Sequence, residues 1–219
     1  MPLYRLHTTG LSPYGQRVCL TLDLKGLTGE TELVETYGGT DALKALAPMA
    51  QIPVLEGPDG VVPESQVIVE YLDSKHAEPA LRAENPTILA QQSLLARIID
   101  LYIAPHTIAL ITAMRGVLSP AAIGEAQKLH MRGFQFVEAY LDNESFAVGE
   151  EVSIADIAIG PFLFYAPQLA SWHDIDDPLV DLPKSRALLK HLQAHPVFAK
   201  VFENMDRAFT KRSEQFAPN

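Results

Sequence analysis

Cysteine, basic residues and uninterrupted apolar runs are scarce in this chain of 219 residues. The single cysteine, Cys19, cannot form an internal disulfide, which fits a reducing compartment such as the cytoplasm. Lysine and arginine number 17 against 27 acidic residues, and the formal net charge of −10 argues against nucleic acid or an anionic membrane as the main partner. The N-terminal segment also lacks the charged leader and apolar core of a signal peptide.

The most apolar stretch, Ile154–Trp172, is interrupted by Asp156, Pro161 and Pro167. It is too short and too broken to span a bilayer, so we expect a buried core helix and no membrane partner. With 47% hydrophobic and 20% charged residues, the composition is that of a compact globular protein with one large domain or two small ones.

Metal and phosphate motifs are missing as well. His191 and His195 lie four residues apart on an expected helix, but no HExxH pattern and no acidic residue at ligand spacing accompany them. Gly38-Gly39 lacks the Lys-Ser/Thr ending of a phosphate-binding loop. We therefore expect neither a metal site nor a phosphate loop of this type.

A strand, a turn and a helix open the chain. Leu3–His7 is strand-like, and Ser12-Pro13 begins a helix as N-cap and first-turn proline, which Gly26 ends. A helix N-terminus carries unpaired N–H groups in a positive local field, so an anion such as a thiolate would be stabilised beside Ser12. Taken alone, the helix favours the simpler interpretation that Ser12 is only a cap.

Short strands and helices alternate up to about residue 80. Glu30–Thr36 alternates polar and apolar residues like an edge strand, and Thr40 can cap a short helix. Ile52–Leu55 and Val61-Val62 flank a Gly-Pro-Asp-Gly turn and predict a β-hairpin. A helix from Glu64 to about His76 completes a βαβ, α, ββα order, which is thioredoxin-like.

The remainder of the chain has helical patterns. We assign residues 1–77 to a first domain, 78–86 to a polar, proline-containing linker, and 87–219 to an all-α helical bundle. Pro105 should kink the first long helix, and Ser119-Pro120 opens the next. Asp156 follows Ser153 at the spacing of a capping box, so we expect a structural role for it at a helix start.

Four phrases, in order and at family spacing, match landmarks of one family: LSPYGQRVCLTLDLKGL, APMAQIPVLEGPDG, PESQVIVEYLD and VSIADIAIGPF. On these phrases the chain resembles the cytosolic glutathione S-transferases over nearly its whole length. The resemblance implies a cytoplasmic homodimer that activates the thiol of glutathione for attack on a hydrophobic electrophile, as in detoxification. Features of the omega, zeta and tau classes occur together, so the resemblance leaves the class open.

Ser12 stands at the catalytic position of the serine-type classes, which favours a functional role for it. Lowering a thiol pKa by ~2 units requires about 2.7 kcal/mol of selective stabilisation of the anion, which a hydroxyl donor and helix amides can supply. Thioredoxins carry Cys-x-x-Cys where this chain has Ser12-Pro13-Tyr14-Gly15, so dithiol chemistry is excluded. Cys19 lies too far along the helix to replace those sulfurs and is expected to be a buried structural residue.

The resemblance also implies how the peptide is held. Ile52-Pro53 matches a cis-proline that turns the Ile52 backbone toward the ligand, whereas base rates alone favour a trans bond. Glu64 and Ser65 match the pair that binds the γ-glutamyl end, Ser65 with its helix N-terminus suiting the carboxylate and Glu64 the ammonium. For the glycyl carboxylate the candidates are Gln51 and Lys44.

A second substrate would bind between the domains in an apolar pocket. Each candidate wall is, taken singly, more typical of a core residue: Tyr14, Tyr102, His106, Met114, Tyr165 and Trp172.

Two functions stay open. The first is glutathione transfer, including dehalogenation, ether cleavage or isomerisation by the same thiolate. The second is a non-catalytic module that binds glutathione or a protein partner. Joint retention of Ser12, Pro53, Glu64 and Ser65 favours the enzyme, because a scaffold would need none of them.

Overall fold

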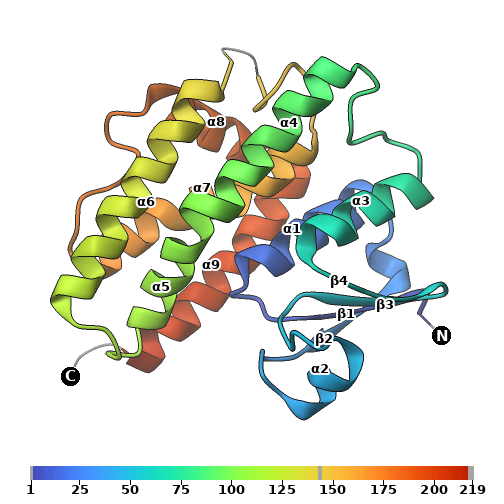
Figure 1. The fold of residues 1–219 in the computed structure, drawn as a ribbon, viewed down its shortest axis with the longest axis horizontal. Helices are drawn as coiled ribbons and strands as arrows, with labels where there is room; N and C mark the ends of the chain where they lie inside the picture. Colours follow the sequence, from blue (N-terminus) through green and yellow to red (C-terminus); the bar gives the residue numbers. More distant parts are fainter. Residues whose placement is uncertain (1, 143–144, 217–219) are drawn as a thin grey trace.

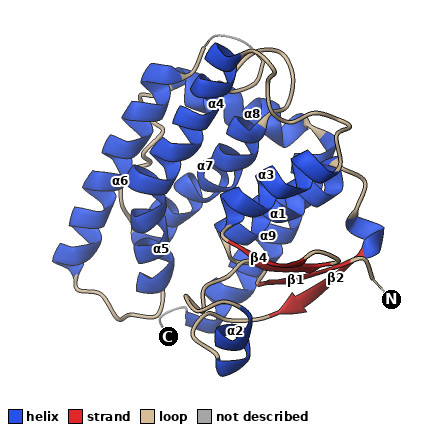
Figure 2. Ribbon diagram, turned by 45° about the vertical axis from the view of Figure 1, so that its right-hand side comes forward, coloured by secondary structure: helices blue, strands red, loops and turns tan. Residues whose placement is uncertain are grey.

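A four-stranded mixed sheet with flanking helices is followed by a bundle of helices (Figures 1 and 2). The computed structural model describes residues 2–142 and 145–216. The sheet domain contains β1 (Tyr4–Thr8), α1 (Pro13–Leu24), the 3-10 turn η1 (Thr28–Glu30), β2 (Thr31–Glu35), α2 (Asp41–Leu46), β3 (Val54–Gly57), β4 (Gly60–Pro63) and α3 (Ser65–Lys75). The thioredoxin-like fold and its element order are confirmed.

The strands lie in the order β2-β1-β3-β4, so the predicted edge strand is indeed at an edge. β1 is parallel to β2 and antiparallel to β3, with Leu6 opposite both Leu33 and Leu55. α1 and α3 cover one face of the sheet, whereas α2 lies against the other (Figure 1). The end of β1, the start of β3 and the start of α3 are thereby brought close to the start of α1.

The helical domain comprises α4 (Pro86–Ile98), the π-helical turn η2 (Ile99–Ile103), α5 (Ala104–Ala113), α6 (Pro120–Tyr140), α7 (Ile154–His173), α8 (Pro183–Ala194) and α9 (Pro196–Phe216). α7 is the buried central helix, as its apolar sequence predicts. The capping box is confirmed: Asp156 accepts N–H bonds from Ser153 at 2.9 Å and Ala147 at 2.7 Å. Burial raises the pKa of Asp156 to about 6.

α4, η2 and α5 form one continuous helix of 28 residues, and a π turn lies just before Pro105, the residue at which we expected a kink. The Ala104 N–H donates to the Ile99 carbonyl, five residues back, and Pro105 has no N–H to donate to Leu101. By length and composition this helix could cross a membrane, but 50% of its apolar window is buried inside the protein. That burial is typical of a core helix.

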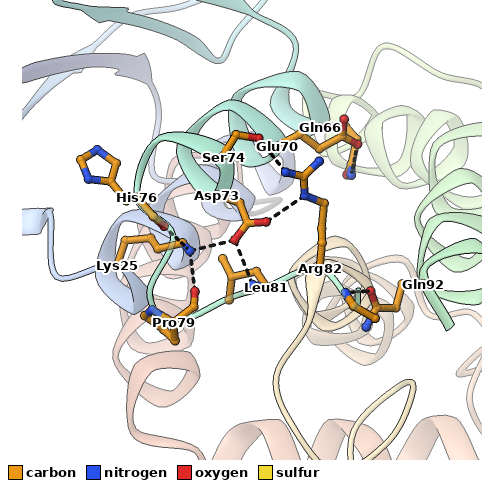
Figure 3. Close-up of polar contacts among 11 residues, drawn as sticks. Lys25, Gln66, Glu70, Asp73, Ser74, His76, Pro79, Leu81, Arg82 and Gln92 are labelled. Atoms are coloured by element: carbon orange, nitrogen blue, oxygen red, sulfur yellow. Dashed lines mark hydrogen bonds and ion pairs between the residues drawn. The ribbon is translucent and has the colours of Figure 1, made fainter. Parts of the chain in front are cut away.

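The segment between α3 and α4 is held by a buried ionic network (Figure 3). Lys25 Nζ donates to Asp73 at 2.8 Å and to the carbonyls of His76 and Pro79. Asp73 also accepts from the Leu81 N–H and from Arg82, both within 2.9 Å. The Leu81 carbonyl in turn accepts the Ile154 N–H at the start of α7. The segment thus ties α1 and α3 to the central helix; the boundaries at 77 and 86 stay predictions.

Candidate functional site

A cavity of about 260 Å³ lies between the loop before β3, the start of α3 and the α4–η2 helix. Of the predicted glutathione contacts it brings together Gln51, Ile52, Pro53, Glu64 and Ser65, but neither Lys44 nor Ser12. The other lining residues are Tyr14, Met49, Pro63, Gln66, Arg97 and Asp100. Lys44 is exposed on α2 and is not part of this cavity.

The Ile52-Pro53 peptide bond is cis, as the resemblance predicts. Pro53 is buried and immediately precedes β3, whereas Ile52 is half-buried and Gln51 is exposed. Gln51, Ile52 and Pro53 all lie on the cavity wall. An extended peptide can therefore approach the backbone at Ile52.

The N-terminus of α3 opens onto the same cavity. Its first residue, Ser65, is 5% exposed, and no side chain caps the helix. Glu64, just before it, has a φ of 70°, a left-handed conformation that costs a non-glycine residue about 1–3 kcal/mol. Unpaired amides and a serine hydroxyl favour an anion there, and the exposed Glu64 carboxylate favours a cation beside it.

Ser12 is the N-cap of α1, and its Oγ accepts the Gly15 N–H at 3.1 Å. No acceptor for its hydroxyl hydrogen is present in the part of the chain that the structure describes. Ser12 is half-buried and does not line the cavity, whereas Tyr14, two residues further on, does. The geometry therefore leaves a free O–H donor at the positive end of a helix whose second residue, Tyr14, lines the cavity.

Beneath the cavity lies a residue that the sequence did not single out, Arg17, which is 0% exposed. It donates to Asp100 at 2.7 Å, to Ser65 Oγ at 3.4 Å and to the Ala158 carbonyl at 3.2 Å. Both Arg17 and Asp100 are charged residues in apolar helices, which was a usable sequence signal. Because the two residues lie 83 positions apart in the chain, the sequence did not show that they form a pair.

The expected walls of a second-substrate pocket do not gather around this cavity, apart from Tyr14. Tyr165 and Met114 are buried in the helical core, and the Tyr165 hydroxyl donates to the Leu11 carbonyl at 3.2 Å. Tyr102 is exposed and packs edge-on against Phe136. His106 and Trp172 are half-buried.

Cys19, His191 and His195 each pack against apolar side chains. Burial raises the pKa of the Cys19 thiol to about 12, which makes it a poor nucleophile. His191 and His195 both pack against Phe146. Within residues 2–142 and 145–216, no three His, Cys, Asp or Glu side chains are grouped as metal ligands.

Comparisons with known proteins agree with one another. A family model described as the glutathione S-transferase N-terminal domain matches residues 6–80, and one described as the glutathione S-transferase C-terminal domain matches residues 106–196. Glutathione S-transferase 1 of Dianthus caryophyllus is 30% identical over 172 residues, 75% of this chain and 75% of that protein.

Two further similarities are to an isomerase and to a solved structure. Maleylacetoacetate isomerase of Mus musculus is 28% identical over 189 residues, 83% of this chain and 84% of that protein. The crystal structure of a theta-class glutathione S-transferase from Xanthomonas axonopodis pv. citri, with glutathione bound, has a TM-score of 0.78 at 22% identity, covering 92% of this chain and 98% of that one.

Proposed function

Because the chain belongs to the glutathione S-transferase family, we propose that its cavity at the start of α3 binds glutathione and that Ser12 activates the thiol. One observation carries the proposal: Gln51, Ile52, Pro53, Glu64 and Ser65 line one cavity, close to the helix that Ser12 caps. As a member of this family the protein is a glutathione-dependent enzyme, with glutathione as cosubstrate.

The peptide lies extended across the cavity and pairs with the Ile52 backbone. Its γ-glutamyl carboxylate takes the free N–H groups of α3 and the Ser65 hydroxyl, and its ammonium faces Glu64. Its glycyl end reaches Gln51; Lys44, exposed on α2, is the second candidate for this carboxylate.

Ser12 donates its hydroxyl hydrogen to the glutathione sulfur and stabilises the thiolate, while the thiol proton goes to solvent. The sulfur then attacks the electrophile: an S–C bond forms, and a leaving group departs with the bonding electron pair. Ser12 is a hydrogen-bond donor in this scheme and never a nucleophile.

Isomerisation is the second candidate reaction, because several relatives are named maleylacetoacetate isomerase. In it, the sulfur adds to a carbon–carbon double bond, the resulting single bond rotates, and the sulfur leaves again. Glutathione recovery separates the two reactions: conjugation consumes one thiol per product, and isomerisation of maleylacetoacetate consumes none.

The test of Ser12 is an ultraviolet titration of the thiolate of bound glutathione. In the native protein, the thiol pKa should fall about two units below its free value of roughly 8.5, and Ser12→Ala should restore it. Ser119→Ala is the matched control, since Ser119 caps α6 in the same way, far along the chain from the cavity.

Each outcome of this titration is informative. Binding without a pKa shift would contradict Ser12 activation and favour the non-catalytic binding module. No binding at all would contradict the site itself.

We also propose a cytosolic homodimer. A rice relative, 35% identical over 75 residues, is named as cytosolic, and dimers are typical of the family. Apolar side chains exposed on β4, α3 and the α4–η2 helix supply a surface for a second copy: Val61, Val67, Ile88, Leu94 and Leu101.

A further inference from the structure

A second cavity, of about 540 Å³, lies between α1, the edge strand β2 and α9. Part of its wall is the loop that leads from β1 to Ser12, through Thr8, Thr9 and Gly10. Among the described residues, none lines both this cavity and the proposed glutathione cavity. Its volume is in the range of small-molecule sites, and the proposed function gives it no role.

The cavity is elongated, because α9 runs antiparallel to α1 along it. Lys200 pairs with Asp23, near the end of α1, at 2.8 Å. Just before the start of α1, a Cβ at Gly10 would lie 3.0 Å from the Ala208 Cβ. The lining residues of α9 extend from Lys200 to Lys211, and at about 1.5 Å per residue this wall is roughly 16 Å long. A ligand that fills the cavity is therefore longer than it is wide.

The walls along this length favour an apolar, uncharged molecule. Apolar side chains come from all three elements: Cys19, Leu22, Leu33, Val201 and Ala208. Lysines and carboxylates are equal in number in the lining: Lys200, Lys211, Asp23 and Glu35. Since Lys200 and Asp23 also pair with each other, the cavity offers no net charge that would select an ion.

Two buried polar side chains lie at the loop end of the cavity. Gln16 is 4% exposed, and its Nε2 donates to the Gly10 carbonyl at 3.0 Å and to the Thr9 carbonyl at 3.4 Å. Carbonyls only accept, so the amide nitrogen must face them, and the Oε1 has no donor in the part of the chain that the structure describes. The Thr9 hydroxyl, on a residue 9% exposed, likewise has no partner there.

A buried amide oxygen without a donor is costly, and a ligand hydroxyl removes that cost. Such a hydroxyl can donate to the Gln16 Oε1 and accept from the Thr9 hydroxyl, whereas an ether oxygen can only accept. We propose that this cavity is a second ligand site, which binds a neutral, elongated phenol or alcohol with its hydroxyl at Gln16 and Thr9 and its apolar body between β2 and α9. The inference does not depend on the proposed glutathione site.

The experiment measures binding of two matched probes by calorimetry: para-hexylphenol and its methyl ether, para-hexylanisole. The two share the ring and the alkyl chain, and only the phenol can donate a hydrogen bond. The native protein should bind the phenol at least about fivefold more tightly, which is the effect of one hydrogen bond. Adding S-methylglutathione should not displace the phenol, because the two cavities have separate walls.

Matched variants locate the probe and its hydroxyl. Asn204→Trp places an indole in the cavity from an exposed position of α9 and should weaken binding of both probes at least about tenfold. Glu203→Trp is its control, since Glu203 is exposed on the same helix and does not line the cavity.

Gln16→Met keeps the side-chain length without the amide oxygen and should reduce the preference for the phenol to less than about twofold. Gln92→Met removes another buried glutamine, on α4 and outside the cavity, and should leave the preference unchanged. If Gln16→Met fails to fold, the two tryptophan variants still test the cavity, and the two probes still test the donor on the native protein.

Three results would overturn the inference. The first is that the native protein binds neither probe, or binds both equally. The second is that Asn204→Trp and Glu203→Trp have the same effect, because the probe would then lie elsewhere. The third is displacement of the phenol by S-methylglutathione, which would place it in the proposed glutathione site. Failure of S-methylglutathione itself to bind would contradict only the proposed function.

Discussion

Gly15 and Thr8 are so close that a Cβ at Gly15 would lie 1.8 Å from the Thr8 Oγ1 and 3.0 Å from its Cβ. Because the two residues are so close, the first turn of α1 packs against the end of β1. The Gly15 N–H also donates to the Ser12 Oγ. The glycine therefore helps to set the position of the proposed catalytic hydroxyl.

Gly15→Ala should force α1 away from β1 and lower the free energy of unfolding by about 1–3 kcal/mol, as overpacking does. Gly124→Ala is the control, since Gly124 lies in α6 with open space around it, and alanine should stabilise that helix by about 0.5–1 kcal/mol. Urea unfolding measures both. Equal, small effects of the two substitutions would contradict the close approach.

Acid should destabilise the protein through His130, which is 2% exposed and has its Nε2 2.9 Å from Thr107 Oγ1. Burial, with a smaller contribution from His106, lowers the pKa of His130 from 6.5 to about 3. Below pH 6.5, His130 therefore binds a proton in the unfolded chain but stays neutral in the folded protein. Stability falls as the pH drops through this window, by at most about 1.4 kcal/mol per pH unit.

His130→Gln keeps a hydrogen-bonding partner for Thr107 and removes the titration. Between pH 7 and 5 it should lose about 2 kcal/mol less stability than the native protein. Asp156 titrates in the opposite sense, because its raised pKa favours folding at low pH, but it is common to both proteins. Parallel pH profiles of the two proteins would contradict this assignment.

Removing Asp73 should be among the most damaging single changes in the first domain. Asp73→Ala leaves the fully buried Lys25 side chain without its ionic partner, and we expect a loss of about 3–5 kcal/mol. Asp59→Ala is the comparison: Asp59 pairs with Lys75 at the surface, and the loss there should stay below about 1 kcal/mol. If Asp73→Ala lost as little stability as Asp59→Ala, the network in Figure 3 would contribute little to the stability of the fold.

The proposed dimer predicts that Leu101→Glu gives a monomer at micromolar concentration, because an unpaired charge would be buried between the copies. Leu101 is 48% exposed on η2. Leu33→Glu, at a leucine 63% exposed on the edge strand β2, should leave the dimer intact. Sedimentation velocity distinguishes these cases, and a monomeric native protein would refute the dimer directly.

Local signals were sufficient to predict much of this molecule. The Ser12-Pro13 helix start, the alternation of β2 and the Ser153–Asp156 capping box each depend on residues a few positions apart. Their physical causes, which are caps, strand periodicity and fixed proline geometry, act within one turn of chain. The order of the first domain followed from these signals.

Contacts between distant segments could not be read in the same way. Arg17 meets Asp100 because α1 packs against α7, which also packs against the π turn that carries Asp100, and the sequence contains no record of that packing. Likewise, Pro105 indicated where the long helix would be disturbed, but the sequence did not indicate the π turn Ile99–Ile103 just before it. In the sequence, Lys25 looks like an ordinary lysine at the end of a helix. Only the structure shows that its Nζ donates to the carbonyls of His76 and Pro79.

Burial of Arg17 between the two domains also limits how these domains can be exchanged between proteins. Asp100 and Phe162, which partner its charge and cover one of its faces, both come from the helical domain. A first domain transferred to another protein without them would carry an uncompensated guanidinium on its newly exposed surface. Recombination at the linker is therefore tolerated only with a recipient that already offers a carboxylate and an aromatic ring at these places, so the two halves must evolve together.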